Sequence, residues 1–135
     1  MENQDELSKL SYIITGAIFE VSHTLGCGFL EAVYQEALEL ELKSRGLKVE
    51  PQKKMKVSYK GTVLQCEYVP DIIVEGRVII ELKATNALDN INRAQILNYL
   101  RVSNLPFGVL VNFGTPRVQI ERYENKFKNN SINPY

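Results

Sequence analysis

Two acidic residues and one lysine form the clearest chemical pattern in the sequence. Asp71 and Glu81 each lie in an otherwise apolar, β-branched stretch, where an unpaired carboxylate is expensive to bury. Two buried carboxylates on adjacent strands repel each other unless a cation lies between them, and Mg²⁺ prefers such oxygen ligands. Lys83 stands two residues after Glu81, so on a strand both side chains point to one face. A metal ion that activates water beside this ammonium group would suit attack on a phosphoryl centre.

This chemistry requires a particular register between the two stretches. Glu75 and Gly76 separate them and indicate a hairpin turn. With a two-residue loop, Asp71 and Glu81 would fall on opposite faces of the hairpin. One shared metal therefore predicts a three-residue loop or a bulge at 75–77, with Gly76 supplying a positive φ. The face that does not carry the carboxylates is then predicted to pack against helices through Ile72, Val74, Ile80 and Leu82.

Two helices are predicted to bring further groups to this site. Gln95 and Tyr99 stand four residues apart in a helix predicted over about 89–103, with Asn90 as its N-cap, so they share a helix face. Glu31 lies one turn into a helix that follows the glycine-rich break LGCGF. It can reach the same metal as a further ligand. The alternative is an ordinary acidic residue favoured by the positive end of the helix dipole.

The remaining patterns predict a mixed α/β fold. Apolar residues at helical spacing predict an additional N-terminal helix over roughly 5–23. Strands are predicted at 54–61, 66–76, 77–84, 106–114 and 117–123. Three meandering strands, a crossover helix and a returning strand then form one mixed sheet with helices packed against it. Residues 1–124 are predicted to form a single domain, and 125–135 a flexible tail.

The bulk composition limits how the chain meets its partners. It has 135 residues, 44% of them hydrophobic, and its 16 basic and 16 acidic side chains balance to a net charge of zero. Nucleic-acid contact must therefore come from bound metal or from a local patch, for which Arg93, Lys53 and Lys54 are weak candidates. No apolar run reaches the roughly 18 residues needed to span a bilayer. No basic and apolar leader begins the sequence. A cytoplasmic protein without a membrane partner is therefore expected.

Three motifs resemble those of a known family, and the resemblance covers roughly 8–122. Pro70-Asp71 followed by Glu81-Leu82-Lys83 resembles the motif of the PD-(D/E)xK nuclease superfamily. Gln95 and Tyr99 resemble the QxxxY element found in several of its branches. The run from Gly26 to Tyr34, GCGFLEAVY, resembles the signature of the GxxExxY proteins, a small family within that superfamily.

The resemblance implies a restriction-endonuclease-like αβββαβ core, on which the first helix is an addition. It implies that Asp71, Glu81 and the Leu82 carbonyl hold Mg²⁺, for which Mn²⁺ would substitute, and that Glu31 is an extra ligand. It implies that Lys83 is catalytic and that a DNA phosphodiester is hydrolysed, while RNA and branched DNA stay open as substrates. Because the chain is small for gripping a duplex alone, we expect a homodimer or a partner protein.

Two other classes of function remain in view. The first is a non-catalytic module that binds nucleic acid or protein on the same fold, although binding alone has no need of two carboxylates beside a lysine. The second is a glycosidase that uses a carboxylate pair. That chemistry needs no adjacent lysine, and the chain has no tryptophan with which to stack a sugar. Gln95 and Tyr99 also fit an ordinary helix surface, which leaves their role open.

Overall fold

A computed structural model describes residues 4–127 of the chain. Of the predicted tail 125–135, residues 128–135 lie outside the described part. In chain order the elements are α1 (Gln4–Leu25), α2 (Glu31–Ser44), β1 (Val49–Pro51), β2 (Met55–Tyr59), β3 (Thr62–Tyr68), β4 (Ile72–Val74), β5 (Val78–Lys83), α3 (Asn90–Ser103), β6 (Phe107–Asn112) and β7 (Gln119–Glu124).

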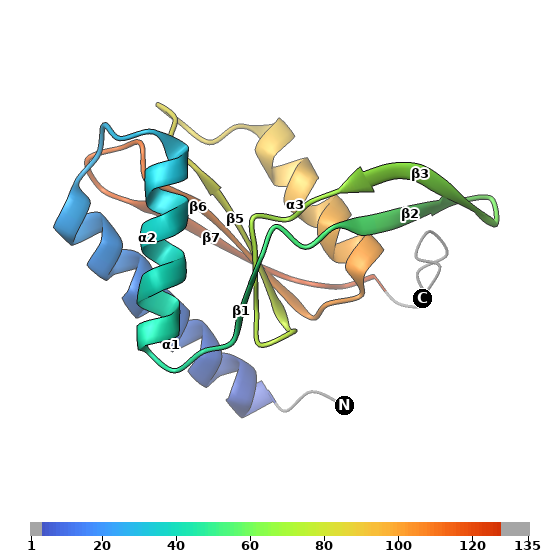
Figure 1. The fold of residues 1–135 in the computed structure, drawn as a ribbon, viewed down its shortest axis with the longest axis horizontal. Helices are drawn as coiled ribbons and strands as arrows, with labels where there is room; N and C mark the ends of the chain where they lie inside the picture. The colour runs from blue at the N-terminus through green and yellow to red at the C-terminus, as the bar shows by residue number, and fades with distance from the viewer. Residues whose placement is uncertain (1–3, 128–135) are drawn as a thin grey trace.

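A five-stranded mixed sheet forms the centre of the molecule. Its strand order is β1-β4-β5-β6-β7. Only β5 and β6 run parallel; the other neighbours are antiparallel. Parallel neighbours need a crossover connection, and α3 supplies it. In Figure 1, α1 and α2 lie together on one side of the sheet and α3 lies on the other. The predicted mixed α/β fold is therefore confirmed, with a restriction-endonuclease-like core.

The sheet is buried on both faces. One face packs against α1 and α2 through a cluster that includes Ile72, Val74, Ile80 and Leu82, as predicted. The other face packs against Ile96 and Leu100 of α3 through Ile73, Ile79 and Leu110. Burial on both faces explains why these strands are almost continuously apolar in the sequence. Glu81 and Lys83 follow Ile79 by steps of two, so they lie on the α3 face.

The predicted three-strand meander is wrong in two respects. The stretch 66–76 is not one strand: it divides around Pro70 into β3 and β4. Pro70 has no N–H to donate to a ladder, so a strand is readily interrupted there. β2 and β3 form a separate two-stranded sheet, a hairpin that projects from the body in Figure 1.

The missing core strand is β1, which pairs antiparallel with β4. Its three residues are too few to show a period in the sequence. The core order α2-β1-β4-β5-α3-β6 is therefore αβββαβ, with the β2–β3 hairpin inserted between β1 and β4.

Helix α3 begins at a capping box that sets its first turn. The N-cap is Asp89, not Asn90 as predicted: the Asp89 side chain accepts from the Asn92 N–H, and the Asn92 side chain accepts from the Asp89 N–H. An aspartate in this position satisfies a backbone donor that the helix leaves free.

Within 4–127, no helix has both the length and the apolar character needed to cross a bilayer.

Candidate active site

The turn between β4 and β5 determines which face carries the acidic residues. The register pairs Ile73 with Ile79 and Val74 with Val78, which leaves three residues, 75–77, in the loop. The predicted three-residue loop is confirmed. Gly76 has a φ of 62°, as expected, but Glu75 also has a positive φ of 55°. Continued by two residues past Ile73, the same register places Asp71 opposite Glu81 on the α3 face.

Each of the two carboxylates accepts a hydrogen bond from a backbone N–H of the opposite arm of the hairpin. The Asp71 N–H donates to Glu81 Oε2 at 2.6 Å, and the Leu82 N–H donates to Asp71 Oδ2 at 2.8 Å. Glu81 is buried, with 3% of its surface exposed. Neither Asp71 Oδ1 nor Glu81 Oε1 accepts a hydrogen bond from any residue in 4–127. Each acid therefore keeps one oxygen available to a ligand.

The site is electrostatically poised for a cation. Burial raises the pKa of Glu81 to about 8, and the neighbouring charge of Asp71 adds to the shift. Burial also raises the pKa of Asp71, against the opposing effect of its hydrogen bond from Leu82. Both pKa values rise because two negative charges in one buried place are unfavourable. A bound divalent cation would reverse that preference, so this donor set fits a hard metal ion such as Mg²⁺.

The Leu82 carbonyl points toward the same place. In a strand the N–H and C=O of one residue face the same neighbour, and the Leu82 N–H faces Asp71. The position opposite Leu82 in the continued register is Pro70. Because proline has no N–H, it cannot occupy that carbonyl with a ladder bond. The Pro-Asp pair thus leaves one main-chain oxygen beside the two carboxylates.

Lys83 lies on the same face as Glu81, half-buried at the end of β5. Its positive charge lowers the pKa of both Asp71 and Glu81, although burial outweighs this effect. Among the described residues its ammonium group makes no ion pair with a carboxylate within 4 Å. The lysine is thus close enough to act electrostatically on the site and still free to donate to a ligand.

Glu31 lies close to this group but outside its centre. Its charge raises the pKa of both Asp71 and Glu81. In the described part of the chain, however, no three acidic, histidine or cysteine side chains lie close enough together to hold a metal ion. A ligand set of the Asp71 and Glu81 carboxylates with the Leu82 carbonyl stays a prediction. The role of Glu31 as a further ligand stays a prediction.

Gln95 and Tyr99 approach the site from α3. Gln95 Nε2 donates to Tyr99 Oη at 3.1 Å, so the two residues act as one unit. Burial raises the pKa of Tyr99, and the charge of Glu81 raises it further. Tyr99 therefore lies within electrostatic reach of the acidic pair, while a role for Gln95 and Tyr99 in the site stays a prediction.

Comparison with known proteins identifies the family. A family model described as the PD-(D/E)XK nuclease superfamily matches residues 8–123. The chain belongs to this superfamily. A solved structure titled "Crystal structure of SSO0001" is similar, with a TM-score of 0.57 and 18% sequence identity over 73% of this chain and 52% of that one. This chain thus spans about half the length of that protein, and the likeness shows the fold alone. No curated protein matches.

Members of the PD-(D/E)XK superfamily are generally nucleases. Members of the superfamily typically use divalent metal ions. The donor oxygens at Asp71, Glu81 and Leu82 are consistent with that requirement.

Two supporting residues of the site are not evident from the sequence patterns. Gln35 Nε2 donates to the Asp71 carbonyl at 2.8 Å and thereby fixes the backbone that carries the first acid. Its spacing of four from Glu31 on α2 is a signal that could have found it. Asn112 is fully buried beside Lys83 in the parallel register. It binds the N–H and the C=O of Thr85, which anchors the chain just after the lysine.

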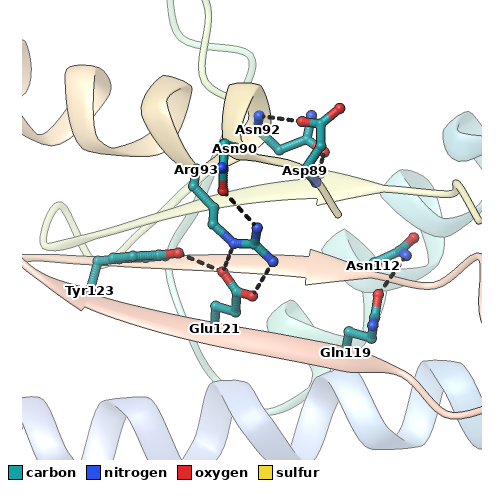
Figure 2. Close-up of polar contacts among 8 residues, drawn as sticks. All are labelled: Asp89, Asn90, Asn92, Arg93, Asn112, Gln119, Glu121 and Tyr123. Atoms are coloured by element: carbon teal, nitrogen blue, oxygen red, sulfur yellow. Dashed lines mark hydrogen bonds and ion pairs between the residues drawn. The ribbon is translucent and has the colours of Figure 1, made fainter. Parts of the chain in front are cut away.

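The weak substrate-binding candidates lie elsewhere. The Arg93 guanidinium makes two 2.9 Å hydrogen bonds to Glu121 of β7, and a third bond to Asn90. Figure 2 shows this arrangement, with Tyr123 donating to the same carboxylate. Arg93 therefore ties α3 to β7, and a phosphate contact by it stays a prediction. Lys53 and Lys54 line a separate cavity near the β2–β3 hairpin.

Proposed function

We propose that this chain is a Mg²⁺-dependent nuclease that hydrolyses phosphodiester bonds of DNA, and that it belongs to the GxxExxY branch of the superfamily. One observation carries the proposal: two buried carboxylates, locked by reciprocal backbone hydrogen bonds, lie on one sheet face with a lysine two residues further along. A structural ion pair would need only one carboxylate here. Two acids in such a place are costly unless a cation offsets them.

Each residue has a defined task in this proposal. Asp71 Oδ1, Glu81 Oε1 and the Leu82 carbonyl would hold the ion, and Mn²⁺ would substitute for Mg²⁺. When bound, the ion supplies Lewis acidity to a phosphoryl oxygen and to water. The Asp71 and Leu82 N–H groups keep both carboxylates in place, so little reorganisation is needed.

Lys83 would orient the attacking water and stabilise charge on the phosphate by donating from its ammonium group. The water oxygen would give up a proton to solvent and form a new bond to phosphorus. The bond from phosphorus to the leaving oxygen would break, and that oxygen would take up a proton from solvent. Gln95 and Tyr99, already joined by a hydrogen bond, would position the phosphate or Lys83. A second copy or a partner protein would provide the additional grip on a duplex.

A cleavage assay tests the proposal. Single-stranded, duplex and branched DNA and RNA are each incubated with the chain in Mg²⁺, Mn²⁺ or EDTA. Glu81→Ala and Lys83→Ala are compared with Glu36→Ala, a control on the exposed side of α2. We expect metal-dependent cleavage of DNA that both site variants lose and the control keeps. Absence of cleavage by the parent together with retained nucleic-acid binding would instead support the non-catalytic binding module.

A further inference from the structure

A basic cavity lies at the base of the β2–β3 hairpin, against the C-terminal end of α3. Its volume is about 250 Å³, and its lining includes Lys53, Lys54, Lys56, Tyr68, Val102 and Ser103. No acidic side chain is among the residues that line it. Because a water occupies only about 30 Å³ of liquid, the cavity has room for a phosphate group with its hydration.

The lysines of this cavity are not firmly neutralised. Lys53 pairs with Glu50 at 3.4 Å and Lys56 with Glu67 at 3.9 Å, both at the surface. Surface ion pairs of this kind are weak, so an incoming phosphate can compete with them. Within 4–127, Lys54 makes no ion pair with any acidic side chain. In a chain of zero net charge, this concentration of positive charge is a local feature.

Tyr68 contributes a second, independent feature. Its hydroxyl oxygen is buried and has no hydrogen-bond partner among the described residues. Buried polar groups are nearly always hydrogen-bonded, so such a group calls for a ligand. Burial, followed by the nearby Tyr99, raises the pKa of Tyr68, which keeps its phenol protonated. The cavity thus combines three cations with an unused hydrogen-bond donor, which is the chemistry that recognises phosphate oxygens.

Two stacked tyrosines connect the cavity to the acidic site. The ring of Tyr68 stacks on that of Tyr99, with centroids 4.9 Å apart and planes inclined by 28°. Tyr99 in turn lies near Glu81. Tyr68 is three residues before Asp71, which limits their Cα separation to about 11 Å. The cavity and the acidic site are therefore close enough for one short segment of a strand to reach both.

We propose that this cavity binds a backbone phosphate of the same nucleic-acid strand whose scissile phosphodiester lies at Asp71 and Glu81, a few nucleotides away. The inference rests on the proposed nuclease function and adds the path of the substrate strand. Lys54, Lys56 and the Tyr68 hydroxyl would contact phosphate oxygens, and the Tyr68–Tyr99 stack would separate the two phosphate positions. Because phosphate contacts carry no sequence information, binding here should be independent of sequence.

Equilibrium binding without divalent metal tests the cavity separately from catalysis. Fluorescence anisotropy of a labelled single-stranded DNA oligonucleotide is followed over a salt series in EDTA. Lys54→Gln and Lys56→Gln are each expected to weaken binding and to reduce the slope of log K against log salt by about 0.7, the value for one phosphate contact on a single strand. Lys43→Gln is the matched control, because α2 lies on the far side of the molecule from the hairpin in Figure 1. It should leave the slope unchanged.

Tyr68→Phe removes only the hydroxyl and keeps the aromatic stack. We expect the affinity for the oligonucleotide to fall several-fold with the salt slope unchanged, because a neutral donor is lost. The melting temperature should stay equal or rise, since a buried polar group without a partner has been removed. A merely structural role for Tyr68 would give the opposite pair of results: lower melting temperature and unchanged affinity.

Several outcomes would overturn the inference. Parent-like binding and slope in both lysine variants would do so, as would a parent that binds no oligonucleotide. Stabilisation by inorganic phosphate that depends on Lys54, without Lys54-dependent oligonucleotide binding, would assign the cavity to free phosphate instead of a strand. Failure of the nuclease proposal alone would give another result. The lysine variants would change the salt slopes as expected, but the parent would cut no substrate in Mg²⁺.

Discussion

The molecule contains two hairpins with opposite characters. In the β4–β5 hairpin every strand residue is buried except Lys83, and both faces pack against helices. In the β2–β3 hairpin nearly all of β3 is exposed, and the pair forms a sheet of its own. Burial fixes the register of the first hairpin, because a slip of one residue would expose its core side chains and turn its carboxylates away. In the second hairpin only β2 is partly buried, so burial constrains the register less.

This difference suggests a division of labour. In the proposed function, chemistry that depends on atomic positions would belong to the buried hairpin, where backbone N–H groups hold the Asp71 and Glu81 carboxylates in place. Contact that depends mainly on charge would belong to the exposed hairpin and its cavity, which Lys53, Lys54 and Lys56 line. Precise sites are better supported by packed elements than by mobile ones.

The largest contrast is expected in core packing. Ile80→Ala in β5 removes a fully buried side chain and should lower the free energy of unfolding by about 2–5 kcal/mol. Val63→Ala in β3, where 46% of the side chain is exposed, should cost less than about 0.5 kcal/mol. Urea unfolding followed by circular dichroism measures both. Equal costs would show that the exposed hairpin is also part of the packed core.

The next contrast concerns the pH dependence of stability in the absence of metal. The pKa of Glu81 is raised from 4.5 to about 8, so the folded chain binds this proton more tightly than the unfolded chain. Its stabilisation is complete below about pH 4.5 and is lost as the pH rises through about 8. Glu81→Gln should therefore match the parent at acidic pH and exceed it above pH 8, by on the order of a few kcal/mol.

Thermal melts of the parent and variant across this pH range provide the measurement. Glu67→Gln on the exposed β3 strand is the control, because it changes the same kind of charge outside the buried site. It should show no such divergence from the parent. A parent whose stability relative to Glu81→Gln does not fall between pH 5 and 9 would contradict the shifted pKa.

The smallest contrast concerns a supporting hydrogen bond. Gln35→Ala removes the donor to the Asp71 carbonyl and should cost about 1 kcal/mol in unfolding free energy. By loosening the backbone of a ligand, it should also weaken metal affinity by about 10-fold. Gln65→Ala on the exposed β3 strand should change neither quantity. Equal metal affinities in the two variants would show that the Gln35 hydrogen bond does not support metal binding.

The sequence was sufficient to predict that Asp71 and Glu81 share one face, because the proposed chemistry restricted the hairpin register. Two acids that share one metal required a three-residue loop at 75–77, and the register has it. Parity along the strand then placed Lys83 beside Glu81. Local patterns were also sufficient for the three helices and for the apolar strand β6, whose periodicity or length is clear.

The features that the sequence did not predict depend on contacts between residues far apart in the chain, which no local pattern shows. β1 is recognisable only by its pairing with β4, and the division of 66–76 follows from the exit of β3 into a second sheet. Gln35 meets Asp71 across 36 residues, and Arg93 meets Glu121 across 28. The Arg93 guanidinium, which the sequence suggested for phosphate binding, is thus bound by Glu121, a residue that helical spacing could not reveal.

Calorimetric titration of Mg²⁺ into the parent and Glu81→Gln near neutral pH tests the central claim most directly. Because the pKa of Glu81 is raised to about 8, the apo chain should hold this proton at neutral pH and release it when the ion binds. The account predicts saturable binding whose heat varies with the ionisation enthalpy of the buffer, and loss of both binding and proton release in Glu81→Gln. Binding that survives unchanged in the variant, or no binding by the parent, would contradict it.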